Sequence, residues 1–197
     1  MTEGLRRLVI WLTVALAMLW GTPVAADSQI TISDSAIRKI LIDQLYTDNG
    51  KYHLLRASPC QFAYLESPVV VVLRGRVHLR TRLTGMLGAE SATGCNGTPE
   101  SFHVTISGRP YFSGEFLGLS DLRVDDAPTD LYKVVLQSFL DSALPRAMQI
   151  NLREGLEQML AAQGAAYDVS VEKIQVSDLS ADNDHIRLDL SFSLFAD

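Results

Sequence analysis

Few side chains in this chain could do chemistry, and none of them lie in a familiar catalytic spacing. Two histidines at helical spacing would indicate a metal site, but the histidines are scattered: His53, His78, His103 and His185. Ser170 and Lys173 match S-x-x-K without the companion motifs of that group, and we interpret the match as chance. Asp125 and Asp126 are interpreted as a turn and the cap of a following helix. The sequence therefore predicts a non-enzymatic protein without a metal or cofactor.

A row of basic residues is the most distinctive polar feature. Arginines recur on one side of an alternating run, at Arg74, Arg76, Arg80 and Arg82. On one face of a strand, such a row presents forked donors suited to phosphate or carboxylate head groups, at a membrane or on a bound lipid. The same row is typical of a solvated sheet face with cross-strand pairs to Glu or Asp. We favour the solvated face and keep the four arginines as candidate anion-binding residues.

The alternating run predicts one long strand. From Val69 to Thr84, apolar and polar side chains alternate almost without error, and at ~3.3 Å per residue the strand would span roughly 50 Å. A helical pattern from Thr129 to Gly164, interrupted at Pro145, reaches about 50 Å at ~1.5 Å per residue. The match predicts an α+β fold in which a long, curved antiparallel sheet wraps a long Pro-kinked helix, with a short N-terminal helix capped by Ser33.

Apolar side chains on the expected inner faces are candidates for lining a ligand site between sheet and helix. These candidates are Val71, Leu73, Val77, Leu79, Val104, Ile106, Phe112, Phe116, Phe139, Leu140, Leu144, Met148, Leu188, Leu190 and Phe192. The pattern indicates which residues point inward but not whether they meet. A lipid tunnel and an ordinary closely packed core are therefore both open interpretations.

The two cysteines of the chain, Cys60 and Cys95, both follow turn-forming residues. In an oxidising compartment they are expected to pair, and a loop of this size would stabilise the fold by about 3–4 kcal/mol. A reactive or metal-binding pair is the alternative, but no histidine cluster lies near either cysteine in the sequence.

The first 26 residues have the pattern of a signal peptide. Arg6 and Arg7 precede an apolar stretch, and small residues stand just before Asp27. Cleavage after Ala26 is predicted, which leaves one domain, residues 27–197, in the bacterial periplasm. The apolar stretch is short for a membrane-spanning helix, and an uncleaved anchor is the alternative.

The charge balance excludes one class of partner. The chain has 17 Lys and Arg against 23 Asp and Glu, a net charge of −6, and loss of the leader makes this balance slightly more negative. A nucleic-acid-binding protein needs an overall basic field or a large basic face. Nucleic acid is therefore not an expected partner.

The order of the expected elements resembles a single module of the tubular lipid-binding (TULIP) superfamily, in particular its small bacterial periplasmic members. The segments that carry the likeness are residues 32–37 at the first helix, 114–119 in a hairpin, and 136–144 before Pro145. Many of those proteins are lipoproteins, whereas this chain has no cysteine near the expected cleavage position. The resemblance implies that apolar chains are held between the sheet and the helix.

Two functions of different kinds follow as expectations. The first is binding, or carriage, of a lipid, a fatty acyl group or another apolar chain between sheet and helix. The second is a ligand-free adaptor with a dry core that binds another envelope protein. An anionic membrane surface is a further expected partner, through the arginine row. A void of roughly several hundred Å³ would support the first function, and close packing would support the second.

Overall fold

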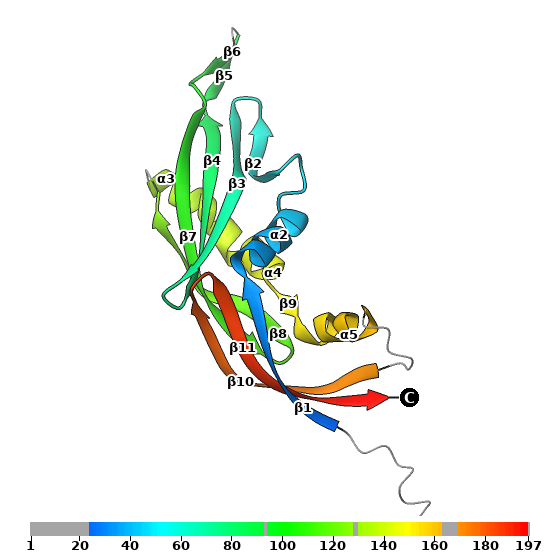
Figure 1. Ribbon diagram of the computed structural model, residues 1–197. Helices are drawn as coiled ribbons and strands as arrows, with labels where there is room; N and C mark the ends of the chain where they lie inside the picture. The colour runs from blue at the N-terminus through cyan, green and yellow to red at the C-terminus, as the bar shows by residue number, and fades with distance from the viewer. Residues whose placement is uncertain (1–23, 93, 128–129, 163–168, 197) are drawn as a thin grey trace, which may run out of the picture.

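The computed structural model describes residues 24–92, 94–127, 130–162 and 169–196 (Figure 1). Of these residues, 62% lie in strands and 24% in helices. The strands are β1 (Val24–Ser33), β2 (Lys51–Ser58), β3 (Gln61–Leu73), β4 (Arg76–Leu87), β5 (Ala89–Ser91), β6 (Gly94–Asn96), β7 (Glu100–Ser113), β8 (Phe116–Asp126), β9 (Ile150–Asn151), β10 (Val169–Asp182) and β11 (His185–Ala196). The helices are α2 (Asp34–Gln44), α3 (Asp130–Ser138), α4 (Leu144–Ala147) and α5 (Leu152–Ala162), with a π-helical turn (Phe139–Ala143) between α3 and α4.

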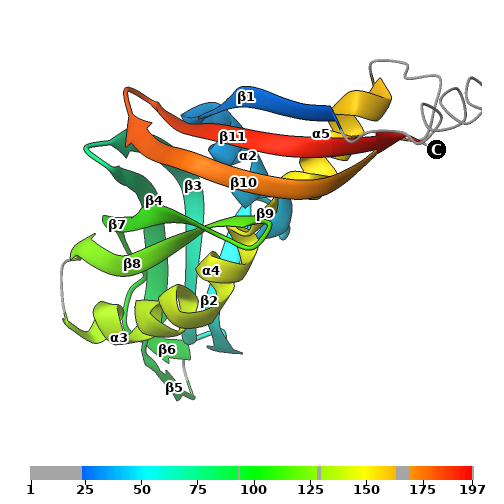
Figure 2. The same ribbon diagram turned by 90° about the horizontal axis from the view of Figure 1, so that it is seen from below.

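The longer strands form two antiparallel sheets. A six-stranded sheet in the order β2-β3-β4-β7-β8-β9 curls into a half barrel, and a three-stranded sheet in the order β1-β11-β10 lies against one end of it. The short β5–β6 hairpin projects from the other end (Figure 1). The helical stretch from α3 to α4 lies in the curve of the six-stranded sheet, and α5 packs against β10 (Figure 2).

The predicted single strand over residues 69–84 is wrong, because the chain reverses in its middle. Arg74 and Gly75 have φ angles of 53° and 75°, and Leu73 pairs directly with Arg76, so a two-residue hairpin turn joins β3 to β4. Across such a turn, odd-numbered residues of one strand point to the same face as even-numbered residues of the other strand. Odd-numbered residues therefore point outward in the last part of β3 and inward in β4, which reassigns half of the predicted apolar face.

The predicted α+β fold, with a sheet wrapped around one long helix, is also wrong. The chain is mostly β, and its helices are short. The helical pattern splits at β9, where Ile150 and Asn151 pair with Leu117 and Phe116 of β8. The ends of the predicted helix, Thr129 and Gly164, lie outside the described residues.

Pro145 does not break the helix where the sequence places the interruption. The π-helical turn comes immediately before it, and Pro145 occupies the first turn of α4, where its missing N–H is tolerated. The helix ends later, after Ala147, and the Leu152 N–H then donates to the Glu115 carbonyl at 2.9 Å. Pairing with β8, rather than the proline, separates α4 from α5.

The predicted first helix is confirmed with its cap. The Ser33 hydroxyl accepts a hydrogen bond from the Ala36 N–H at 3.2 Å, as an N-cap residue does. Ile37 and Leu41 on the apolar face of α2 are buried. The helix therefore packs on the body of the protein as its periodicity indicates.

Backbone hydrogen bonds join the two sheets at one corner. The Gly75 N–H donates to the Ala181 carbonyl at 2.8 Å, and the Asp184 N–H donates to the Val72 carbonyl at 3.1 Å. The Asp34 N–H donates to the Asp184 carbonyl at 2.9 Å. The β3–β4 turn, the β10–β11 turn and the start of α2 are thereby held together, and this corner fixes how the sheets meet.

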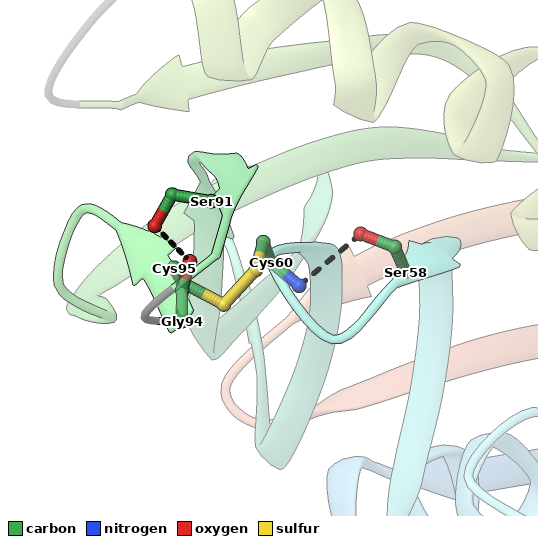
Figure 3. Close-up of a disulfide and its surroundings, with 5 residues drawn as sticks. All are labelled: Ser58, Cys60, Ser91, Gly94 and Cys95. Carbon is green, nitrogen blue, oxygen red and sulfur yellow. Dashed lines mark hydrogen bonds between the residues drawn. A yellow bond between two sulfur atoms is a disulfide. The ribbon is translucent and has the colours of Figure 1, made fainter.

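The predicted disulfide between Cys60 and Cys95 is confirmed, with Cα atoms 5.3 Å apart (Figure 3). It ties the turn between β2 and β3 to the β5–β6 hairpin. Two hydrogen bonds order its surroundings: the Cys60 N–H donates to the Ser58 hydroxyl at 3.2 Å, and the Ser91 hydroxyl donates to the Gly94 carbonyl at 2.7 Å. The bond therefore anchors an otherwise projecting hairpin.

The predicted signal peptide falls largely on residues 1–23, which lie outside the described residues. Strand β1 begins at Val24, so cleavage after Ala26 would shorten this strand. In the described ranges, no helix has the length and apolarity that a membrane crossing requires. Cleavage and export stay predictions.

Candidate functional site

Part of the predicted lining meets at one place between the six-stranded sheet and the helices. This place, which we call the seam, is lined mainly by apolar residues. It is lined by Leu41, Val77, Leu79, Ile106, Ser107, Gly108, Leu119, Leu122, Leu144 and Met148. Its free volume is about 10 Å³, close to the room that one water molecule needs on the same measure. The seam is thus a closely packed contact rather than an open tunnel.

The other predicted lining residues lie elsewhere. Three of these predicted lining residues are buried in the same core, further along the half barrel: Val104, Phe139 and Leu140. Those on the three-stranded sheet are Leu188 and Leu190, which are buried, and Phe192, which is half-buried. Those at the β7–β8 hairpin are Phe112, which is half-buried, and Phe116, which is 44% exposed.

Val71 and Leu73 require a correction. They are 39% and 46% exposed and lie on the outer face of β3, because the turn at Arg74 and Gly75 inverts the alternation. The inward residues of this part of β3 are Val70 and Val72, which are 4% and 0% exposed.

Several lining residues of the seam were not predicted from the sequence. Leu41 is on the apolar face of α2, and its helical periodicity could have identified it. Leu119 and Leu122 are both in β8, where the register shifts and Asp121 has a φ of 49°. A bulge of this kind puts residues three apart on one face, which simple alternation cannot anticipate.

The helical cover of the seam has an irregular backbone. Leu144 and Met148 line the seam from α4 and the residue that follows it. The π-helical turn precedes α4, Pro145 lies within α4, and β9 follows α4 closely. Irregular helical turns of this type often occur at functional sites.

The structure separates the four predicted anion-binding arginines into two kinds. Arg76 is 7% exposed, and its guanidinium donates to the Asp121 carboxylate at 2.7 Å and to the Ser107 hydroxyl at 3.0 Å. Arg82 forms a cross-strand ion pair with Glu66 at 2.8 Å. Arg82 follows the interpretation of a sheet face with cross-strand pairs. Arg76 does not, because it is buried and its partner Asp121 lies on β8, which does not pair with β4.

Arg74 and Arg80 are the remaining two arginines of the row. Arg74 lies in the hairpin turn and Arg80 on the outer face of β4, and both are exposed. Within the described residues, neither side chain has a hydrogen bond or an ion pair. They stay candidate anion-binding residues.

The Arg76–Asp121 pair gives a prediction about stability. We expect Arg76→Met to lower the free energy of unfolding by about 2 kcal/mol, because hydrogen bonds to a charged group would be lost from a buried side chain. Denaturant unfolding at neutral pH measures the change. Arg80→Met is the matched control on the same strand and face, and we expect it to change stability by less than about 0.5 kcal/mol.

The same pair predicts a pH dependence. The hydrogen bond from Arg76, with the charges of Arg76, Arg109 and Arg123, holds the pKa of Asp121 below its ordinary value of 3.8. Because the pKa of Asp121 is lower in the folded protein than in the unfolded chain, its ionised carboxylate stabilises the fold at pH values above the unfolded-state pKa. This contribution is lost as the pH falls through the folded-state pKa. The stability lost in Arg76→Met, measured as the decrease in the free energy of unfolding, should therefore become smaller below about pH 4. A decrease that is constant with pH, or that is equally large in Arg80→Met, would contradict the assigned pair of Arg76 and Asp121.

Across the described residues, no three His, Cys, Asp or Glu side chains converge in a way that could hold a metal ion.

Comparison with known proteins places the chain in no family. No family model matches it, and no curated protein matches it in sequence. Among solved structures, it is similar to a crystal structure of a lipopolysaccharide binding protein, with 11% sequence identity and a TM-score of 0.30. The similarity covers 89% of this chain and 51% of that chain, so this chain spans about half of that protein.

Proposed function

We propose that this protein binds a lipid or another apolar chain without chemical turnover, in the bacterial periplasm and within a TULIP-like framework. One observation carries the proposal: side chains from α2, α4, β4, β7 and β8 converge on a seam whose lining side chains are apolar except for Ser107. An apolar lining of this kind suits an acyl chain. The proposal rests on the seam and not on the likeness to the lipopolysaccharide binding protein, whose TM-score is 0.30.

Binding in the seam requires the seam to open. Its free volume is about 10 Å³, whereas ligand pockets hold roughly 300–1,000 Å³. The opening element is α4, because Leu144 and Met148 close one side of the seam. Beyond α4, the two residues of β9 and the Leu152–Glu115 hydrogen bond attach this stretch to β8.

The close packing of the seam favours a second function. A dry, well-packed core is what a ligand-free adaptor would have, with its surface binding another protein of the cell envelope. The two functions differ in whether the seam ever opens to a ligand.

Organic extraction of protein purified from the periplasm, followed by mass spectrometry, tests the proposal. We expect acyl-chain lipids in the extract and saturable uptake of a fluorescent fatty acid by the stripped protein. The intact mass in the same experiment reports whether the chain begins at Asp27. A clean extract together with no fatty acid uptake would overturn lipid binding and leave the adaptor.

A further inference from the structure

The outer face of β3 carries mostly apolar side chains. Ala63, Leu65, Val70 and Val72 point into the core, so the alternate residues point outward, with a bulge at Ser67 and Pro68 between the two halves. We call these outward residues the β3 strip. It consists of Phe62, Tyr64, Glu66, Val69, Val71 and Leu73.

The strip has an aromatic end and an aliphatic end. Phe62 and Tyr64 stack with ring centroids 6.0 Å apart. Val69, Val71 and Leu73 are 50%, 39% and 46% exposed. Three consecutive outward aliphatic side chains on one strand form a continuous exposed apolar surface, which marks an interaction site more often than scattered apolar residues do.

The one acidic residue of the strip is neutralised. Glu66 forms an ion pair with Arg82 at 2.8 Å and accepts a hydrogen bond from the Thr84 hydroxyl at 3.2 Å. Its charge is therefore balanced within the protein, and it does not repel an anionic partner.

Cations flank the strip on both sides. On the β2 side, Lys51 Nζ lies 4.2 Å from the centre of the Tyr64 ring. On the β4 side, Arg80 is opposite Val69, and Arg74 follows Leu73 in the turn. These cations are a local departure from an acidic chain with a net charge of −6.

Acidic groups lie at one end of the strip. The hydrogen bond from the Asp184 N–H to the Val72 carbonyl brings the β10–β11 turn, which follows Asp182 at the end of β10, to this end of β3. Arg74 lies at this same end, and the positive charge along the rest of the strip comes from Lys51 and Arg80.

We propose that the β3 strip docks on the surface of an anionic lipid bilayer. The aliphatic and aromatic side chains would enter the boundary between head groups and acyl chains, as apolar faces of interfacial segments do. Lys51, Arg74 and Arg80 would extend to the phosphates, because long basic side chains bury their stems and keep their charges in the polar layer. A bilayer offers this apolar layer and this anionic layer side by side. The proposal is independent of whether the seam binds a ligand.

Co-sedimentation with vesicles tests the docking surface. The purified full protein is mixed with vesicles of phosphatidylcholine alone, or of phosphatidylcholine with phosphatidylglycerol. We expect sedimentation with the anionic vesicles, weakened by salt as the screening length falls to ~3 Å at 1 M. The variant Val69→Ser/Val71→Ser/Leu73→Ser should bind at least about tenfold more weakly, because such binding scales with the apolar area buried.

The arginines are tested in a separate variant. Arg74→Gln/Arg80→Gln should weaken binding to anionic vesicles roughly twenty-five-fold at low salt, about fivefold for each arginine. The matched controls remove exposed apolar or basic residues elsewhere: Val134→Ser/Met159→Ser, whose native side chains are 72% and 58% exposed, and Arg146→Gln on α4. Both controls should sediment like the unaltered protein.

A fluorescence readout keeps the test decisive if a multiple variant unfolds. Trp11 and Trp20 both precede the predicted cleavage position, and they are replaced by Phe where the leader is retained. Val71→Trp then supplies a single tryptophan in the strip, and brominated lipids in anionic vesicles should quench it. Val134→Trp should not be quenched.

Three outcomes would overturn the proposal. The first is no sedimentation of the unaltered protein with anionic vesicles, which would assign the strip to a protein partner. The second is binding of the variant Val69→Ser/Val71→Ser/Leu73→Ser to anionic vesicles as strong as that of the unaltered protein. The third is equal quenching of the tryptophans at positions 71 and 134.

Discussion

Replacing Cys60 and Cys95 together by alanine is expected to lower the free energy of unfolding by about 4 kcal/mol. The two cysteines are 35 residues apart, and a cross-link of that span removes a large part of the loop entropy of the unfolded chain. The loop contains β3, β4 and the β5–β6 hairpin. Loss of the bond should therefore destabilise the half barrel as a whole, and denaturant unfolding of the variant measures the change.

Ser58→Ala is the control for local effects at the same turn. It removes the hydrogen bond that the Cys60 N–H donates to the Ser58 hydroxyl and keeps the disulfide, so we expect a loss of about 1 kcal/mol. Reduction of the unaltered protein with a thiol should reproduce the double alanine variant. A loss of less than about 1 kcal/mol in that variant would mean that the unfolded chain is already compact without the bond.

Much of the local structure could be predicted because it depends on neighbouring residues. Ser33 caps α2 through a hydrogen bond three residues away, and the apolar side of that helix follows its own period. The cysteine pair could be predicted from the composition and from the expected export of the protein. These features require no knowledge of which distant segments meet.

The predictions of one long strand and one long helix were wrong because a turn with a weak sequence signal and a contact between distant segments determine the structure there. Arg74 and Gly75 look like one more step of an alternating run, because a basic residue fits the pattern and a single glycine is a weak turn signal. The left-handed conformation of both residues makes the turn. Ile150 and Asn151 continue a helical pattern in sequence, yet their pairing with β8 takes them out of the helix.

The candidate site was predicted in part for the same reason. Val77, Leu79 and Ile106 lie on regular strand segments, so their direction and their burial agree with the alternation. Leu119 and Leu122 lie around the bulge at Asp121, where alternation fails. The faces of regular segments are encoded locally, whereas the place where they converge depends on bulges and turns.

The second large effect is expected at the seam, from Leu79→Ala. Leu79 is 3% exposed and lines the seam, so its truncation should lower the free energy of unfolding by about 3 kcal/mol. The same change enlarges the space that a ligand would occupy. If an apolar chain binds in the seam, uptake of a fluorescent fatty acid should increase in this variant although the fold is less stable.

Two further variants separate binding in the seam from a general loosening of the core. Leu83→Ala truncates a residue with 0% exposure on the same inward face of β4, outside the seam lining, and should lose similar stability without a gain in uptake. Gly108→Ala should reduce uptake, because a Cβ there would come 2.6 Å from Leu122 Cδ2 and 3.3 Å from Leu119 Cβ, which fills the seam. If all three variants take up fatty acid equally, the ligand does not enter the seam, and the close packing around Leu79 is that of an ordinary core.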